Sequence, residues 1–493
     1  MLKFFFVRAL ISVANKYNLE TLLEFLEEKN CEIFSTGGTL EEIKKLGFKA
    51  QNIKTITGVP ELIGGRVKTL DHKVFAGILA QDSDKEEMSN LNLGLFDLVV
   101  VNLYPFQESP SIENIDIGGV SLLRAAAKNY ERVTAICDPA DYQSFIANAD
   151  SLEQRKSFAA KVFKHCSAYD AAIFQNLANS KDAQLLNLEK KAQLRYGENP
   201  QQTAALYETT SSNAFGFANF KQHQGKEISF NNLLDLNAAW NIVNEYDATI
   251  PCCAIIKHSN PCGVAIAPNC AQAFIEALSC DTVSAFGGIV AFNVPVDLAC
   301  ANELSNLFVE CVIAPEFSED ALNILKKKAN LRLIEMQWQE DQEKNIYRIN
   351  GAYLVQEPNN SLLDKEKLKI VTEKQIDETL WVDLILAWKV VKHVKSNAIV
   401  VVKDGKTVGI GCGQTNRVKA VEDALKKMDM DTRSAVLASD GFFPFADSIQ
   451  LAAQNNIEVI IQPGGSIKDQ EVINACNELK IAMAFTNLRH FKH

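Results

Sequence analysis

Residues 252–263 read Cys-Cys-Ala-Ile-Ile-Lys-His-Ser-Asn-Pro-Cys-Gly, an apolar run that ends in a polar turn. The run Cys252–Ile256 predicts a buried strand, and the turn places Lys257 and His258 where that strand ends. A lysine there can stabilise developing negative charge, and a histidine can move protons near neutral pH. On these residues alone, a turn histidine that only caps backbone groups is an equally good interpretation.

The same order of elements recurs about 150 residues later. Ala239-Trp240 lies in a predicted helix that leads to the strand and turn just described, and Ala387-Trp388 lies in a helix that leads to the run Ala398–Val402. Repetition of this kind predicts a duplicated α/β domain, although two unrelated α/β segments can resemble each other by chance. The charged stretch 337–374 would link the two copies.

The first part of the chain alternates strand and helix patterns. Strands are predicted at 4–13, 32–34, 95–103 and 133–137, and helices at 19–29, 39–46, 120–128 and 152–178. This alternation predicts an α/β fold with a parallel, doubly wound sheet. The polar stretch 179–193 has no clear strand pattern, and we place a domain boundary there.

Composition limits the possible classes of protein. The 493 residues carry a net charge of -11, which disfavours a general nucleic-acid binder because such proteins need a basic surface. No run of 18 apolar residues predicts a membrane span, and Arg8 interrupts the apolar start, so a strand is favoured over a signal peptide. The 12 cysteines lack Cys-x-x-Cys spacing, which predicts a reducing, cytoplasmic location.

Two glycine-containing segments of the first part are candidate anion sites. Ser35-Thr36-Gly37-Gly38-Thr39 joins a predicted strand to a helix, where backbone amides and hydroxyls can bind phosphate. In the segment 64–70, Arg66 and Lys68 would share one side if the chain were extended there. A plain glycine turn and a solvated basic loop are the structural alternatives.

Two further segments could bind or orient a ligand. Asp116 precedes Gly118-Gly119 and a helix that carries Lys128, so a carboxylate and an amine could exchange protons with one ligand. An Asp that stabilises a helix N-terminus and a surface Lys are at least as good an explanation. The segment 194–200, Leu-Arg-Tyr-Gly-Glu-Asn-Pro, reads as a turn that exposes a cation and an aromatic ring.

His258 and Pro261-Cys262 invite comparison with the zinc site of deaminases. That site needs His-x-Glu and Pro-Cys-x-x-Cys. Ser259-Asn260 follows the histidine here, and Ala265 stands where the second cysteine would be. We therefore expect no metal in this site.

Ordered motifs cover nearly the whole chain. They are STGGT (35–39), GRVKTL (65–70), NLYPF (102–106), DIGG…LRAAAKN (116–129), LRYGENP (194–200), KHSNPCG (257–263), SAFGGIVAF (284–292), VIAP (312–315), AWKVVKHVKSNAIV (387–400), SDGFFPF (439–445), IIQPGGS (460–466) and RHFKH (489–493). In this order they resemble a family of bifunctional purine-biosynthesis enzymes. These enzymes join phosphoribosylaminoimidazolecarboxamide (AICAR) formyltransferase to inosine monophosphate (IMP) cyclohydrolase.

The resemblance implies a fold and two reactions. A methylglyoxal-synthase-like domain at 1–185 would be followed by a formyltransferase domain at 194–493, built from two cytidine-deaminase-like units without zinc at roughly 194–365 and 366–493. Formyl transfer from 10-formyltetrahydrofolate to AICAR would precede ring closure of formyl-AICAR to IMP, with no metal. The expected partners are these small molecules and a second subunit, because the family's transformylase site forms across a homodimer; nucleic acid and membrane are not expected.

The resemblance also assigns roles to residues. It makes His258 the general base, Lys257 the transition-state stabiliser and Asn397 the residue that positions the formyl group, with His493 nearby. It assigns AICAR binding to Arg195, Tyr196, Asn232, Gly287, Glu310 and Arg489, and folate binding to Arg417, Val418, Phe442, Asp447, Ser466 and Ile467. For cyclisation it makes Lys128 the proton donor and acceptor, aided by Lys68, Tyr104 and Asp116. Phosphate and ribose would contact Lys16, Thr36, Gly37, Gly38, Thr39, Arg66, Val67, Thr69 and Asn102.

Three positions depart from the family pattern. Ala14 stands where the family has a serine hydroxyl, Asp71-His72 replaces His-Pro, and Gln201 replaces a histidine. We expect Asp71 to place negative charge near the anion site, so a transformylase with an impaired cyclohydrolase domain is the alternative. A nucleotide-binding regulatory protein without turnover is a third possibility, which the retained lysines and His258 disfavour.

Overall fold

The computed structural model describes residues 7–148, 151–178, 186, 188–209, 215–340, 343–426 and 434–493. Two compact units are present: the first contains the chain up to Leu188, and the second contains nearly all of the rest. Within the described ranges, no helix is both long and apolar enough to cross a membrane. The predicted domain limits, 1–185 and 194–493, remain predictions.

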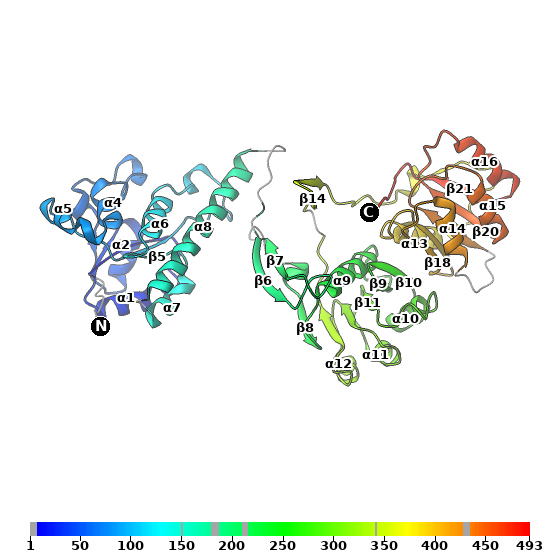
Figure 1. Ribbon diagram of the computed structural model, residues 1–493, viewed down its shortest axis with the longest axis horizontal. Helices are drawn as coiled ribbons and strands as arrows, with labels where there is room; N and C mark the ends of the chain where they lie inside the picture. The colour runs from blue at the N-terminus through cyan, green and yellow to red at the C-terminus, as the bar shows by residue number, and fades with distance from the viewer. Residues whose placement is uncertain are drawn as a thin grey trace. The chain divides into compact units, whose positions relative to one another are not determined.

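The first unit contains a five-stranded parallel sheet, in the order β3-β2-β1-β4-β5. Figure 1 labels β5 and helices around the sheet. The strands of this sheet are β1 (Arg8–Val13), β2 (Glu32–Ser35), β3 (Gln51–Asn52), β4 (Leu98–Asn102) and β5 (Thr134–Ile136). Successive residues of β1 and β4 enter different cores: Ile11 belongs to one hydrophobic cluster, and Leu10 to the other. Both faces are therefore buried, as the Val99–Val101 run requires.

Helices cover both faces of this sheet. They are α1 (Leu19–Glu28), α2 (Gly37–Lys45), α3 (Lys54–Thr57), α4 (His72–Leu79), α5 (Lys85–Asn90), α6 (Gly118–Lys128), α7 (Tyr142–Ala147) and α8 (Leu152–Ala178). Core residues of α1, α2 and α7 share one cluster, and those of α4, α6 and α8 share the other. The predicted parallel, doubly wound sheet is confirmed.

Sequence and structure differ at two element boundaries. The predicted strand at 4–13 begins within the described residues at Arg8, and residues 1–6 lie outside them. The prediction of no strand in 179–193 is wrong for its last part, because β6 (Leu188–Leu194) forms a hairpin with β7 (Ala204–Thr209). The residues of β6 before Leu194 are exposed on both sides, so no alternation of apolar residues marks the strand.

The second unit contains one twelve-stranded sheet built from two equivalent repeats. The first repeat comprises β8 (Lys221–Gln224), α9 (Phe230–Val243), β9 (Cys252–Lys257), β10 (Asn260–Ile266), α10 (Cys270–Leu278), β11 (Ile289–Phe292), α11 (Leu298–Ser305), β12 (Cys311–Ala314), α12 (Glu319–Leu325) and β13 (Arg332–Glu335). The second comprises β16 (Lys369–Ile370), α13 (Trp381–Val391), β17 (Ile399–Lys403), β18 (Lys406–Gly411), α14 (Arg417–Lys426), β19 (Ala435–Ser439), α15 (Asp447–Gln454), β20 (Ile457–Gln462), α16 (Asp469–Glu478) and β21 (Ala482–Phe485).

The strand order shows the duplication directly. It reads β16-β21-β20-β19-β17-β18 and then β10-β9-β11-β12-β13-β8, so each strand has its counterpart at the mirrored place. The repeats join where β10 pairs with β18 at Ala265 and Lys406. Helices α9 and α13 share one hydrophobic core on one face, whereas the other face carries a separate core for each repeat. The predicted internal repeat is confirmed.

A largely buried polar cluster, which includes the Glu245–Lys392 ion pair, joins the repeats beside this shared core. Glu245 follows α9 and His393 follows α13, and each stands five residues after the tryptophan of its helix, Trp240 or Trp388. The two residues are therefore counterparts, and they contact each other with Nε2 of His393 2.7 Å from Oε1 of Glu245. Lys392 also contacts that carboxylate, at 2.8 Å. Burial alone would raise the pKa of Glu245, but these partners lower it to about 2.

The predicted linker between the repeats, 337–374, has structure of its own. Strands β14 (Asn345–Ile349) and β15 (Ala352–Gln356) form an isolated hairpin, and β16 near the end of the stretch already belongs to the second repeat. Every residue of the hairpin strands is exposed.

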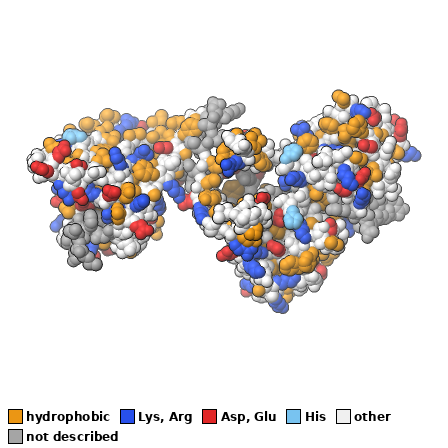
Figure 2. All heavy atoms as spheres, in the orientation of Figure 1, with side chains coloured by type: hydrophobic (Ala, Val, Ile, Leu, Met, Phe, Trp, Pro, Cys, Tyr) orange, Lys and Arg blue, Asp and Glu red, His pale blue; other side chains and the backbone are white. Residues whose placement is uncertain are grey.

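Charged side chains of both signs are mixed on the surface. On the face drawn in Figure 2, Lys and Arg side chains are interspersed with Asp and Glu.

Candidate active sites

Lys257 and His258 lie at a tight hairpin turn. Strands β9 and β10 pair Lys257 with Asn260, so His258 and Ser259 form a two-residue connection. Both have positive φ, 54° and 60°, which is the pattern of a type I′ turn. Asn-Gly, Asp-Gly and Gly-Gly are the preferred sequences for this turn, so Ser259 stands where glycine is usual, whereas histidine adopts positive φ more often than most residues. Nζ of Lys257 donates to the carbonyl of Phe286 at 2.9 Å, and His258 is exposed.

An acidic residue of α9 holds this turn. The Asp235 carboxylate accepts from the backbone N–H of His258 at 3.2 Å and from that of Ser259 at 2.6 Å. The Ser259 hydroxyl also donates to it at 3.3 Å. Sequence reasoning missed Asp235, although Asp383 of the second repeat stands at the same distance before its tryptophan.

The turn lies beside the second repeat. Asn260 donates to the carbonyl of His258 at 3.1 Å and accepts from the backbone N–H of Lys395 at 3.2 Å. Lys395 is followed by Ser396 and Asn397, so the structure brings the predicted formyl-positioning residue into the neighbourhood of His258. The two repeats thus contribute to one site.

A buried network fixes Asn397. Its side-chain oxygen accepts from Arg417 at 2.6 Å, and its amide donates to the Gln414 carbonyl at 2.7 Å. Arg417 also contacts the carboxylate of Asp440, which is completely buried and accepts from the Ser396 hydroxyl as well. Arg417 therefore has a structural partner in addition to its predicted role in folate binding. Asp440 and Ser396 were not predicted as site residues.

The other predicted folate residues lie at one edge of the second repeat. Strands β19 and β20 are parallel, so the segments that follow them lie together. Phe442 and Asp447 follow β19, and Ser466 and Ile467 follow β20; Phe442 is 40% exposed and Ile467 is fully exposed. Lys468 lies over the ring of Phe445 at 4.5 Å, which connects the two segments. Val418, beside Arg417 at the start of α14, is partly buried.

The predicted AICAR residues fall into two groups. Gly287 and Glu310 precede the parallel strands β11 and β12, at the edge where Lys257 ends β9. Asn232, in the first turn of α9, donates to Glu310 at 3.0 Å. The turn that carries Arg195 and Tyr196 lies nearby, because Asn231 donates to the carbonyl of Glu198 at 3.2 Å.

The C-terminal segment lies on the Asn397 side of the site. The backbone of Lys492 exchanges hydrogen bonds with Ser396, donating to its hydroxyl at 3.1 Å and accepting from its N–H at 2.9 Å. Arg489 lies over the ring of Phe491 at 4.4 Å, and exposed His493 contacts the same ring. Arg489, which was predicted to bind AICAR, is thus the second group, and in this subunit it lies with the predicted folate residues.

The first unit gathers its candidate residues at the carboxyl ends of β1, β2 and β4. The strand order changes direction at β1: β2 and β3 lie on one side of it, and β4 and β5 lie on the other. In such folds, ligands bind at the carboxyl ends of the two strands where the order changes, here β1 and β4. Lys16 contacts the carbonyl of Val13 and lies 3.2 Å from the Thr39 hydroxyl. Burial lowers the pKa of Lys16, and Glu42 opposes this effect. Asn102 bonds the backbone of Asn15 twice, at 2.8 and 2.9 Å.

Thr39 has a structural role in this site. Its hydroxyl donates to the Val13 carbonyl at 3.0 Å and accepts from the Val13 N–H at 3.1 Å. The start of α2 is thereby attached to the end of β1. The backbone amides at Gly37 and Gly38 and the buried Thr36 remain candidates for phosphate.

The segment 64–70 is not extended, which corrects the prediction that its two cations share one side. Leu62 and Val67 bridge across a tight turn. Arg66 forms an exposed ion pair with Glu113 at 2.6 Å, whereas Lys68 pairs with Glu61 at 3.2 Å. A Cβ on Gly37 would lie 3.1 Å from Nζ of Lys68, so this ammonium lies over the start of α2.

Asp116 lies at the start of α6. Its carboxylate accepts from the N–H of Gly119 at 2.6 Å, and its own N–H donates to the Tyr169 hydroxyl of α8 at 2.9 Å. Burial raises the pKa of Asp116, and backbone hydrogen bonds from Gly119 and Tyr104 oppose the rise. Thr69 is close, because a Cβ on Gly118 would lie 3.3 Å from its hydroxyl. Exposed Tyr104 and Asp116 thus lie together.

Lys128 is not brought to this place. It is exposed in the last turn of α6, whereas Gly118 begins that helix. At 1.5 Å per residue the two ends of α6 lie about 15 Å apart. Contacts with α8 show the same separation. Tyr169 of α8 contacts Asp116 near the start of α6, whereas Arg155 of α8 donates to the carbonyl of Tyr130, just after the end of α6. The helix geometry separates Lys128 from Lys68, Tyr104 and Asp116.

Asp71, one of the departures, is the N-cap of α4. Its carboxylate accepts from the Lys73 N–H at 2.9 Å, and His72 is 81% exposed at the side chain. This carboxylate satisfies a helix N-terminus, and the expectation that it places negative charge near the anion site stays a prediction.

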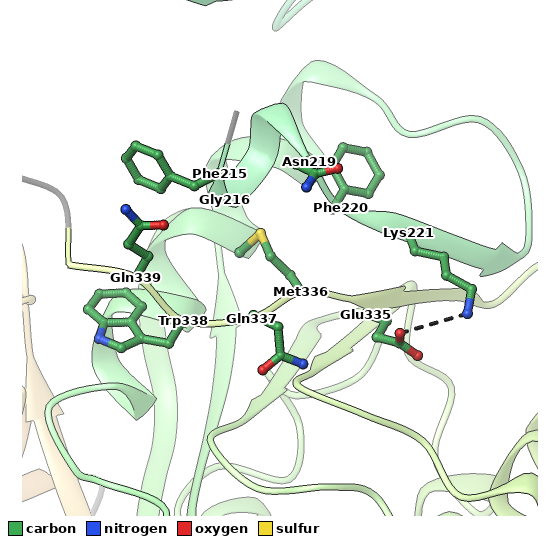
Figure 3. A pocket seen from close by; sticks show the side chains of 10 residues that line it. All are labelled: Phe215, Gly216, Asn219, Phe220, Lys221, Glu335, Met336, Gln337, Trp338 and Gln339. Carbon is green, nitrogen blue, oxygen red and sulfur yellow. Dashed lines mark ion pairs between the residues drawn. The ribbon is translucent and has the colours of Figure 1, made fainter. Parts of the chain in front are cut away.

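A cavity of about 300 Å³ lies away from all of these residues. Figure 3 shows its lining: Phe215, Gly216, Asn219, Phe220 and Lys221 on one side, and Glu335, Met336, Gln337, Trp338 and Gln339 on the other. None of the predicted site residues lines it. Across the described part of the chain, no group of three His, Cys, Asp or Glu side chains is placed to hold a metal ion.

Comparisons with known proteins identify the family to which the chain belongs. The model of the AICARFT/IMPCHase bienzyme family matches residues 126–427, and that of the MGS-like domain matches residues 18–130. Proteins named "Bifunctional purine biosynthesis protein PurH" from Anoxybacillus flavithermus and Clostridium botulinum are 46% and 47% identical over 510 and 504 residues. Each alignment covers 99% of both chains. The chain therefore belongs to the AICARFT/IMPCHase bienzyme family and carries an MGS-like domain at its N-terminus.

Proposed function

We propose that this chain carries out the last two steps of IMP synthesis. It is a bifunctional enzyme of purine biosynthesis, an AICAR formyltransferase and IMP cyclohydrolase that uses a folate-type formyl donor. The observation that carries this conclusion is full-length similarity to the bifunctional relatives, together with two separate groups of candidate residues in two units. The comparisons give no support to an impaired cyclohydrolase.

For formyl transfer, we propose 10-formyltetrahydrofolate as the donor. His258 accepts a proton from the AICAR amine as that nitrogen attacks the formyl carbon, and Lys257 stabilises the negative charge that develops on the formyl oxygen. The bond between the formyl carbon and N10 of the donor then breaks, and tetrahydrofolate leaves with the proton that His258 accepted. Asn397 positions the formyl group. The proximity of the His258 turn to Lys395–Asn397 supports this division of roles.

For cyclisation, the carboxamide nitrogen attacks the formyl carbonyl and water leaves. Lys68 is proposed to bind the phosphate or the developing oxyanion, and Tyr104 and Asp116 are proposed to orient the substrate. The position of Lys68 over the start of α2 and the contact between Tyr104 and Asp116 support these roles. Lys128 is proposed as proton donor and acceptor from the resemblance alone. Its position at the far end of α6 disfavours direct contact with the substrate in this subunit.

A homodimer is also proposed. The isolated hairpin β14–β15 exposes large apolar side chains on both faces: Ile346, Tyr347, Ile349, Tyr353, Leu354 and Val355. A lone two-stranded hairpin is only marginally stable in water, which supports its covering by a second subunit. Light scattering of the purified protein measures its molar mass in solution and so distinguishes a dimer from a monomer.

The test measures two reactions in the same variants: formyl transfer to AICAR, and cyclisation of supplied formyl-AICAR. His258→Ala is expected to lower formyl transfer about 10²- to 10⁴-fold while cyclisation of supplied formyl-AICAR is retained. Asp404→Ala, at the corresponding turn of the second repeat, is the matched control and should leave formyl transfer intact. Retained transfer in His258→Ala would remove the general-base assignment.

A second pair of variants tests cyclisation. Lys68→Met is expected to lower it about 10²-fold, since an oriented cation is lost. Lys128→Met tests whether Lys128 acts as proton donor and acceptor or lies too far from the substrate to take part. Unchanged cyclisation removes Lys128 from the mechanism, and a loss as large as that of Lys68→Met would show that the placement of α6 differs during catalysis.

A further inference from the structure

The His258 turn combines an unfavourable conformation with a reactive side chain. His258 and Ser259 both adopt positive φ, in a two-residue turn where glycine or asparagine is preferred. A conformation of this kind persists only when surrounding contacts hold it. These contacts come chiefly from one side chain, the Asp235 carboxylate, which accepts from both turn amides and from the Ser259 hydroxyl.

The second repeat contains the same contact without the reactive residue. Asp383 of α13 accepts from the backbone N–H groups of Asp404 and Gly405 at 2.8 and 2.7 Å, in the turn between β17 and β18. Asp404 and Gly405 have φ of 52° and 75°, so the turn type is the same. Asp-Gly adopts this turn readily, and the carboxylate there is an addition to a favourable sequence.

We propose that Asp235 is a positioning residue for formyl transfer: its carboxylate fixes the left-handed backbone of His258 and thereby aims the imidazole at the substrate amine. This inference rests on the proposed role of His258. Asp235 itself needs no contact with substrate, because it acts on the turn amides. Its counterpart Asp383 performs the same backbone task where no catalytic side chain depends on it.

The experiment measures kcat and KM for formyl transfer and, in the same preparations, cyclisation of supplied formyl-AICAR. Asp235→Ala is expected to lower kcat for transfer about 10- to 100-fold, because a displacement of about 1 Å costs this much in a preorganised site. KM for AICAR and folate should change less than threefold, roughly, because binding groups are untouched. Cyclisation should be unchanged.

Rescue distinguishes positioning from general destabilisation. Ser259→Gly supplies the residue that a type I′ turn prefers, so Asp235→Ala/Ser259→Gly should regain most of the lost kcat. Asp383→Ala is the matched control, expected to leave kcat for transfer unchanged even where it lowers the melting temperature. Circular dichroism confirms folding of each variant.

Two outcomes would overturn the inference. One is a kcat for transfer in Asp235→Ala within twofold of the parent, roughly; the other is an equal loss in Asp383→Ala with no rescue by Ser259→Gly. Failure of the proposed function is a separate result, since it would appear as undiminished transfer in His258→Ala, whatever Asp235→Ala does.

Discussion

The hairpin turns of the two repeats have the same geometry but different sequences. Between β17 and β18, Asp404-Gly405 is a sequence that the turn prefers, whereas between β9 and β10 the same turn contains His258-Ser259. An aspartate from the preceding helix holds each one. In a duplicated structure, the copy that departs from local preference indicates where function has replaced stability.

A second pair of counterparts shows the same division. Asn293, after β11, uses its amide to bond the carbonyls of Tyr246, Asp247 and Ile250, and its oxygen accepts from the Cys252 N–H. Asp440, after β19, instead contacts the hydroxyl of Ser396 and the guanidinium of Arg417. One copy stabilises a loop, and the other holds a charged network around Asn397.

The largest expected effect comes from making the two turns identical. The graft His258→Asp/Ser259→Gly gives the first repeat the turn of the second. Formyl transfer should fall about 10²- to 10⁴-fold because the imidazole is lost. The free energy of unfolding should stay the same or rise by about 1 kcal/mol, because the new residues favour positive φ. Steady-state kinetics and denaturant unfolding measure the two effects.

The reverse graft sharpens this comparison. Asp404→His/Gly405→Ser places the functional sequence in the second repeat, where it has no role. Formyl transfer should be retained while the protein loses about 1–3 kcal/mol of stability. Equal stability of the two grafts would contradict the view that the His258 turn is strained.

Exchanging the counterparts Glu245 and His393 should have the next largest effect. Glu245→His leaves Lys392 with two imidazoles, and His393→Glu places two carboxylates together, so each single variant should lose about 3–5 kcal/mol. The double exchange restores the contact between an imidazole and a carboxylate and should recover at least half of this loss. Chemical denaturation of the four proteins gives the coupling energy, and additive losses would sink the idea of an exchangeable pair.

The smallest effect concerns acid stability. His490 is 1% exposed against the ring of Trp388, and burial, together with Lys392 and His393, lowers its pKa to about 4. An unfolded histidine titrates near 6.5, so the unfolded chain binds the proton first and stability falls as pH drops from about 6.5 to about 4. His490→Phe keeps a ring at this place and should remove up to about 3 kcal/mol of that pH dependence. An unchanged pH profile of unfolding would refute this assignment.

Periodicity predicted most of the fold, because both sheets are covered on two faces and therefore need long apolar runs such as Ala398–Val402. It failed at β6, whose exposed residues carry no burial pattern. Motifs predicted residues that touch substrate, such as His258. They did not predict Asp235 or Tyr169, because a residue that holds another in place is recognised only when distant segments are seen together. Nor did the motifs predict that Asp71, close in sequence to the site, is the N-cap of α4.

The pairing of Glu245 with its own counterpart has a consequence for how the two repeats associate. A repeat paired with a copy of itself would bring two glutamates together, or two histidines flanked by Lys392, in a buried place. The opposite charges of Glu245 and Lys392 meet only when the first repeat pairs with the second. We therefore expect each repeat to prefer the other as its partner over a copy of itself, because the wrong pairing brings like groups together and loses the Glu245–Lys392 ion pair.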